Sequence, residues 1–186
     1  MLSAHDVARE LRQRQPQAGD VKIHKLVYYC QGWHVAWTGE PMFPEPIEAW
    51  ANGPVVAGLW HDEKRIRARP QAQQPDDQQL GVIDYVIGRY GRYTGLELVR
   101  KTHLEDPWRD ASESEDSSGT ENPAITHDAL RAWFSQDEEY LAHRAAVARL
   151  RERRNIYGFE GSAMPDDLRE ATLRILGESG PQLTAR

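Results

Sequence analysis

Cysteine is nearly absent from this chain, because Cys30 is the single one among 186 residues. An internal disulfide is therefore excluded, which is typical of proteins from the reducing cytoplasm. Long apolar runs are also missing, since no stretch approaches the roughly 18 residues that a membrane helix needs. Residues 1–15 lack the apolar centre of a signal peptide. The sequence therefore predicts a cytoplasmic protein that does not enter a membrane.

Motifs of common catalytic and metal sites are missing as well. There is no phosphate-binding loop, no serine elbow, no His-Glu-x-x-His run and no zinc-type pair of cysteines. His24 and His34 would lie about 15 Å apart along one helix, too far to share an ion. Cys30 and His34 follow an apolar stripe, where a thiol is usually buried and inert and a histidine is hydrogen-bonded. We therefore expect no metal, and catalysis is the weaker hypothesis.

The charge balance is mildly acidic, with 29 acidic side chains against 23 basic ones and a net charge of −6. General nucleic-acid binders are usually basic, because neutralising phosphates releases counterions. Basic side chains cluster at residues 64–69 and 149–154. Either cluster is a nucleic-acid patch or an ordinary solvated surface, and the overall sign favours the solvated surface. Nucleic acid is therefore not the expected partner.

Apolar spacing predicts a mostly α fold. Ser3, Asp20 and Thr126 are expected to cap helices, and Thr94 with Glu97 forms a capping box. The expected helices span residues 3–15, 20–39, 54–61, 77–90, 94–103 and 126–134, with two further patterns at 137–154 and 165–176. The predicted architecture is a compact helical domain with a C-terminal helical extension.

A few segments break the helical pattern. Prolines exclude a helix after residue 41, and a small extended or β element is expected near residues 42–51, with Ile47 and Ala49 on one face. Pro54 is expected to open a short helix. The run Asp106-Pro107-Trp108 is expected to end a helix. Residues 111–121 are polar and acidic and predict a loop.

Aromatic side chains are concentrated between residues 22 and 56, which hold two tyrosines and three tryptophans. Such density belongs either to a core or to a recognition surface. Helical spacing assigns residues 23–37 mainly to the core, with Lys22, Lys25 and Tyr29 near its edge. For Trp37 spacing favours packing, whereas Trp33 and Trp50 stay open.

The same segment resembles a known family. The resemblance rests on an ordered series of motifs, Lys22-x-x-Lys25-Leu26-x-Tyr28-Tyr29-Cys30-Gln31-Gly32-Trp33-His34, then Gly39-Glu40-Pro41-x-Phe43, then Pro46-Ile47-Glu48-Ala49-Trp50-x-Asn52-Gly53-Pro54-Val55-Val56. This series is similar to the Panacea domain, also called SocA-like or phage-associated. A looser likeness continues through Thr102-His103-Leu104-Glu105-Asp106-Pro107-Trp108 to about residue 135. The expected domains are a Panacea-like antitoxin domain at 1–135 and the extension at 136–186.

The resemblance implies an antitoxin of a bacterial or prophage toxin–antitoxin system, with a role in phage defence. Family members are proposed to neutralise unlike toxins by direct protein contact, which implies neither catalysis nor a cofactor. The implied partner is a cognate toxin encoded next to the antitoxin, bound as a heterodimer or a larger hetero-oligomer. The extension after residue 136 departs from the family pattern, and we expect it to help choose the partner.

The candidate toxin-binding residues combine aromatic anchors with the tight turn that follows them. They are Tyr29, Trp33, Glu48, Trp50, Asn52, Gly53 and Pro54. Three alternatives stay open at this point. The protein is a protease adaptor that delivers the toxin, or an enzyme that reverses a toxin-made modification with Glu48, His34 or His61, or a DNA-binding autoregulator that uses residues 149–154.

Overall fold

The computed structural model describes residues 1–62, 73–114, 122–138 and 141. Nearly all of them belong to the first of two units of the chain, Met1–Ser135. Most of the predicted C-terminal extension lies outside the described residues, so the division into domains at 1–135 and 136–186 stays a prediction. The predicted helices at 137–154 and 165–176 and both basic clusters also fall largely or wholly outside them.

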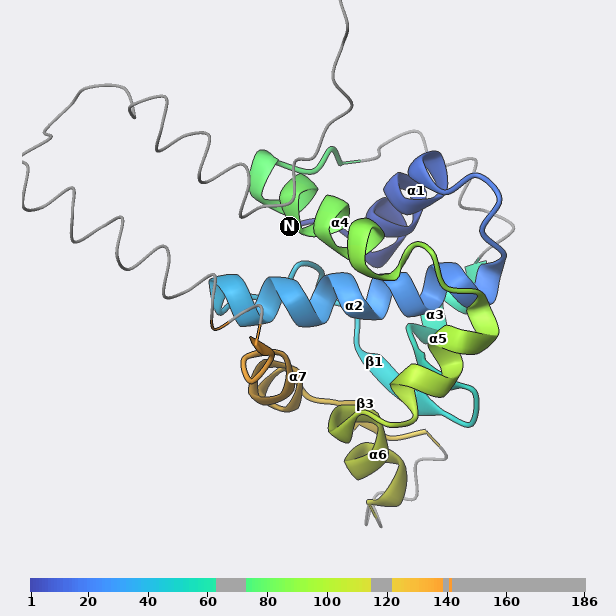
Figure 1. Ribbon diagram of the computed structural model, residues 1–186, viewed down its shortest axis with the longest axis vertical. Coiled ribbons are helices and arrows are strands. Elements are labelled where there is room, and N and C mark those ends of the chain that lie inside the picture. Colours follow the sequence, from blue (N-terminus) through green and yellow to red (C-terminus); the bar gives the residue numbers. More distant parts are fainter. Residues whose placement is uncertain (63–72, 115–121, 139–140, 142–186) are drawn as a thin grey trace, which may run out of the picture. The chain divides into compact units, whose positions relative to one another are not determined.

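Within the described residues the chain forms seven helices and one small sheet, which confirms the predicted mostly α fold. Figure 1 shows α2 crossing the middle of the domain, with α1 and α4 on one side and α5, α6 and α7 on the other. The elements are α1 (Ala4–Arg14), α2 (Asp20–Thr38), β1 (Ile47–Trp50), β2 (Gly53–Val55), α3 (Ala57–Asp62), α4 (Asp77–Tyr90), α5 (Gly95–Thr102), α6 (Asp106–Glu113), β3 (Ala124–Ile125) and α7 (His127–Phe134).

Helix α2 forms the centre of the core. Every residue from Ile23 to Ala36 is buried, as expected for a helix surrounded by others. It packs against α1, α4, α5 and α7. Gly32 allows α7 to approach closely, because a Cβ there would lie 2.2 Å from the Phe134 ring of α7. The helix ends at Gly39, as predicted, with a φ of 83° that favours glycine.

Local capping signals predict most helix starts correctly. Ser3 caps α1, Thr94 and Glu97 form the capping box of α5, and Thr126 caps α7. The prediction for Asp20 is wrong. Gly19 is the N-cap of α2, and the Asp20 carboxylate instead accepts a hydrogen bond from Arg12 at 2.7 Å.

The extended element is a three-stranded antiparallel sheet in the order β2-β1-β3. Ile47 and Ala49 of β1 are buried, as the alternation predicts. The predicted helix start at Pro54 is wrong, because Pro54 lies in β2 opposite Ala49 and α3 begins only at Ala57. Strand β2 is at an edge of the sheet, where a proline is tolerated because its missing N–H is not needed by a further strand.

A second correction concerns Asp106-Pro107-Trp108. This run opens α6 rather than ending the preceding helix, since proline suits the first helical turn. Helix α6 also takes up residues 111–113 of the predicted acidic loop, and residues 115–121 lie outside the described residues. It packs against β1, β3 and α7, so it joins the sheet to the helical part of the domain.

Candidate partner-binding surface

The structure divides the predicted partner-binding residues into a buried set and a surface set. Tyr29, Trp33, Gly53 and Pro54 are buried, whereas Glu48 and Trp50 are half-buried and Asn52 is exposed. The surface set comes entirely from β1 and the turn that follows it.

Two aromatic neighbours explain why Tyr29 and Trp33 are buried. The Tyr29 ring stacks on Tyr90 of α4, with ring centroids 3.8 Å apart. The Trp33 indole N–H donates to the Tyr90 hydroxyl at 3.3 Å, and its ring lies 5.2 Å from that of Phe134. Helices α4 and α7 therefore cover both side chains. The expectation that these two residues reach a partner does not hold in this conformation.

Glu105 ties the start of α6 to the centre of α2. Its two carboxylate oxygens accept hydrogen bonds from the hydroxyls of Tyr28, at 2.8 Å, and Tyr29, at 2.7 Å. Burial raises the pKa of Glu105 from 4.5 to about 7, although the two hydroxyl donors act in the opposite direction. The sequence alone does not indicate a role for Glu105. In the structure its carboxylate links α6 to α2.

The turn before β2 rests on a buried lysine. Lys25, which the sequence places near the edge of the core, is only 2% exposed. Its ammonium donates to the Pro54 carbonyl at 3.0 Å. Gly53 has a φ of 91°, and a Cβ there would lie 2.7 Å from Thr102 Oγ1 and 3.0 Å from Lys25 Nζ. The glycine is therefore required by both backbone conformation and close contact.

The buried ammonium predicts a pH-dependent stability. Burial lowers the pKa of Lys25 from 10.5 to about 7. Between these values the unfolded chain binds more protons than the folded one, so stability rises with pH. We expect the free energy of unfolding to increase by about 1–2 kcal/mol from pH 7 to pH 8.5. Urea titrations at both pH values measure the increase, which should disappear in Lys25→Met. An equal increase in that variant would contradict this assignment.

An accessible aromatic cluster lies beside the turn. The Trp50 indole N–H donates to Glu48 Oε2 at 2.7 Å, which fixes both side chains on one face of β1. Helix α3 places two more rings next to Trp50, with centroids 6.0 Å away for Trp60 and 6.2 Å away for His61. Trp60 is 39% exposed. We call this cluster the hairpin surface, and its members are Glu48, Trp50, Asn52, Trp60 and His61.

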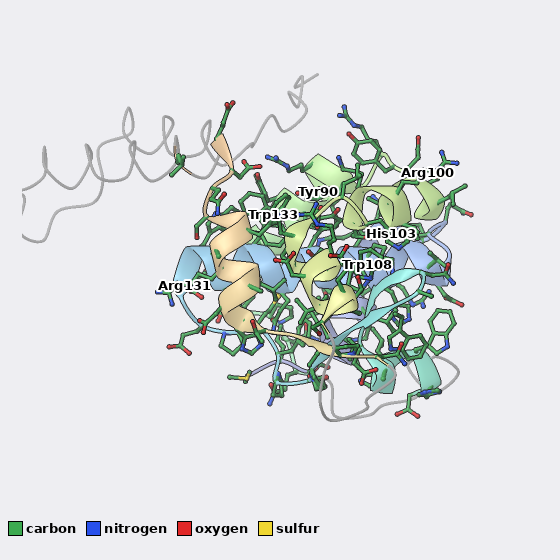
Figure 2. All side chains as sticks on the ribbon, turned by 90° about the horizontal axis from the view of Figure 1, so that it is seen from below. Tyr90, Arg100, His103, Trp108, Arg131 and Trp133 are labelled. Carbon is green, nitrogen blue, oxygen red and sulfur yellow. The ribbon has the colours of Figure 1, made fainter. Side chains whose placement is uncertain are left out.

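The side chains of Trp108, His103 and His24 support the hairpin surface from the interior of the domain. Trp108 of α6 donates its indole N–H to the Trp50 carbonyl at 2.9 Å. The Trp108 ring is stacked on the His103 ring, with ring centroids 3.9 Å apart. Figure 2 shows His103 and Trp108 next to each other where α5 meets α6. The His24 ring of α2 lies 5.1 Å from Trp60, and burial lowers the pKa of His24 to about 4. The His24 ring is therefore uncharged at neutral pH.

Comparison with protein families identifies the central segment. Residues 23–109 match the family model described as antitoxin SocA-like, Panacea domain. This segment of the chain is similar to a Panacea domain. The matched segment runs from α2 into α6, so it includes the hairpin surface, Lys25 and Glu105. The family resemblance of the motifs is thereby confirmed. No curated protein and no solved structure matches the chain.

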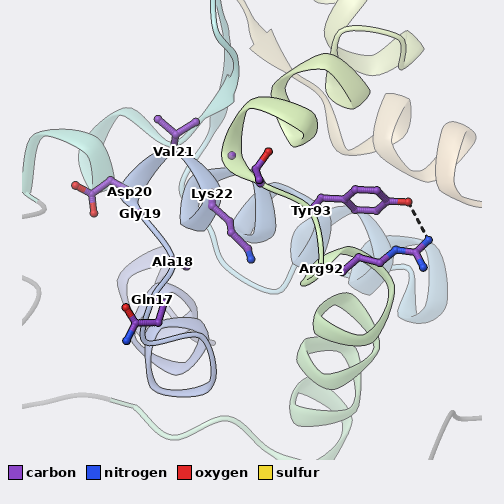
Figure 3. A pocket seen from close by; sticks show the side chains of 10 residues that line it. Gln17, Ala18, Gly19, Asp20, Val21, Lys22, Arg92 and Tyr93 are labelled. Carbon is purple, nitrogen blue, oxygen red and sulfur yellow. Dashed lines mark hydrogen bonds between the residues drawn. The ribbon is translucent and has the colours of Figure 1, made fainter.

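A cleft of about 400 Å³ lies elsewhere in the described part, between the start of α2 and the connection from α4 to α5 (Figure 3). Lys22 donates to the Gly91 carbonyl at 2.6 Å, and Arg92 donates to the Tyr93 hydroxyl at 3.0 Å. The lining contains no histidine, serine or cysteine. The cleft therefore presents the cations of Lys22 and Arg92 together with the Asp20 carboxylate.

The cysteine and the histidine that the sequence offers as chemical candidates both lie in the core. Cys30 is fully buried, and burial raises the pKa of its thiol. His34 is 6% exposed and its Nδ1 is 2.8 Å from the Glu40 carbonyl. Both placements agree with the sequence prediction. Among the described residues no group of three histidine, cysteine or acidic side chains could hold a metal ion. None of the described helices is long and apolar enough to cross a membrane.

Proposed function

We propose that this protein is an antitoxin that neutralises a toxin by direct contact through the hairpin surface. The match of residues 23–109 to the Panacea domain carries the proposal, because that family is described as antitoxin-like. The toxin is the product of the adjacent gene in a bacterial or prophage genome. Neutralisation needs neither a catalytic step nor a cofactor, because occupation of the toxin's surface is sufficient.

The chemistry of the hairpin surface supports this function. Tryptophan dominates binding hot spots because it buries a large rigid surface and keeps a polar handle. The Trp50 side chain is already held by Glu48, and its backbone carbonyl by Trp108, before any partner arrives. Binding therefore costs little additional side-chain entropy. The net charge of −6 would also speed the approach of a basic toxin.

Co-expression tests the function. The product of the adjacent reading frame should arrest growth alone, and the full chain should restore growth and co-purify with that product. Trp50→Ala and Glu48→Lys proteins with unchanged circular dichroism should lose rescue. Leu96→Ala is the matched control, because Leu96 is 61% exposed but lies outside the hairpin surface. Full rescue by both surface variants would rule out this binding site.

The amount of toxin in the same cells reveals the mode of neutralisation. A blocking antitoxin leaves the toxin level unchanged and the toxin bound, as we propose. A protease adaptor would lower that level, and rescue would then depend on an active protease. Toxin that disappears on co-expression would therefore replace the blocking mode with the adaptor mode.

A further inference from the structure

The hairpin surface combines aromatic faces with a carboxylate. The Trp50 and Trp60 rings meet at 61°, so they are not stacked face to face. Trp60 is the large aromatic residue of the described part that is most open to solvent, at 39%. The face of an indole ring attracts a cation more strongly than any other side-chain ring. The arrangement therefore suits a positively charged group.

Glu48 supplies the matching negative charge. Its carboxylate accepts a hydrogen bond from Trp50, and no described lysine or arginine pairs with it. Lys25, the cation under the turn, is buried and bonded to the Pro54 carbonyl. Asp62 adds a second carboxylate at the end of α3, 3.8 Å from His5. None of the five members of the hairpin surface is a lysine or an arginine. Within the described residues the formal charge of the hairpin surface is therefore negative, with Glu48 as its carboxylate.

From this geometry we propose that the hairpin surface binds an arginine side chain of the toxin. The guanidinium lies on the open face of Trp60 and donates an edge to Glu48, while Trp50 holds the carboxylate in place. Arginine fits better than lysine, because its planar group stacks on a ring and offers parallel N–H donors at the same time. The identity of the partner rests on the proposed function, whereas the preference for a guanidinium rests on the side chains alone.

A small probe tests the recognition chemistry without the toxin. N-acetyl-arginine amide is titrated into the full chain while the tryptophan indole N–H signals are followed by NMR. N-acetyl-citrulline amide is the matched control, because it has nearly the same shape but no charge. We expect the arginine probe to shift the Trp50 and Trp60 signals at millimolar concentration, and the citrulline probe to bind about fivefold more weakly or not at all. Equal shifts with both probes, or none with either, would overturn the proposal.

The toxin itself tests the partner. Relative to wild type, Trp60→Phe should weaken toxin binding by about threefold, Glu48→Gln by about tenfold and Trp60→Leu by about thirtyfold. Unchanged affinity in Glu48→Gln and Trp60→Leu, with toxin still bound, would overturn the inference and leave the proposed function standing. A wild-type chain that binds the arginine probe but no toxin would instead overturn the proposed function.

Discussion

Replacing Gly53 with alanine should destabilise the folded domain by about 3 kcal/mol. Two separate costs contribute. A side chain is strained at the φ of 91°, and the added Cβ would lie 2.7 Å from Thr102 Oγ1 and 3.0 Å from Lys25 Nζ. Both neighbours are buried, so neither can move away without disturbing the contact between α2, α5 and the hairpin.

Two other glycines separate these costs. Gly39 also has a positive φ, of 83°, but nothing lies within 4 Å of its added Cβ, so Gly39→Ala should cost only about 1 kcal/mol. Gly81 lies in α4 with neither constraint, and Gly81→Ala should stabilise the domain by about 0.5–1 kcal/mol. Urea unfolding of the three variants measures the series. Equal losses in Gly53→Ala and Gly39→Ala would contradict the close approach of Lys25 and Thr102.

Removing the buried carboxylate should cost even more. Glu105→Ala leaves the hydroxyls of Tyr28 and Tyr29 without their acceptor and opens a cavity, for an expected loss of about 4 kcal/mol. Glu105→Gln keeps the size of the side chain and one acceptor oxygen, so its cost should be about 1 kcal/mol. Urea titration of both variants near pH 7 checks the difference. A Glu105→Ala protein as stable as Glu105→Gln would show that the two hydroxyls do not need Glu105.

The same residue has a distinct pH signature. The folded pKa of Glu105, about 7, is above its ordinary value of 4.5, so the folded state holds this proton more tightly. The stabilisation is complete below pH 4.5 and is lost as the pH rises through 7. His24 has a pKa lowered to about 4 and contributes the opposite slope. The difference between wild type and Glu105→Gln cancels the effect of His24, and it should shift by about 3 kcal/mol between pH 4.5 and pH 7. No shift in that difference would exclude a raised pKa.

Local signals account for what the sequence predicts well. Ser3, Thr94 and Thr126 cap their helices through bonds to the next turn, so a few consecutive residues contain all the information. Alternation in β1 is local in the same sense. The prediction that Pro54 opens a helix is wrong, because proline also suits an edge strand. Only the pairing with Ala49 decides between the two.

Contacts between distant segments explain what the sequence does not reveal. Glu105 meets Tyr29 across 76 positions, and Lys25 meets Pro54 across 29. Neither polar pair leaves a periodic pattern along the chain, and so Lys25 is expected at an edge although it is buried. The one local signal for Glu105 is its place in the motif Glu105-Asp106-Pro107-Trp108.

The candidate surface is partly predictable for the same reason. Glu48, Trp50 and Asn52 follow from the strand pattern and the turn, and all three reach the surface. Trp33 and Tyr29 are also aromatic candidates, but α4 and α7 cover their side chains. Trp60 is missed because its exposure depends on how α3 packs beside β1. Its position in a short helix just after a tryptophan-bearing hairpin is the signal that points to it.

Direct binding between the purified partners is the most immediate test of the hairpin surface as the toxin-binding site. Isothermal titration calorimetry of the full chain with the product of the adjacent reading frame should give a dissociation constant of about 1 μM or below. Glu48→Lys, with unchanged urea stability, should bind about 100-fold more weakly, because a like charge then faces the incoming arginine. Wild-type affinity in Glu48→Lys would contradict the account.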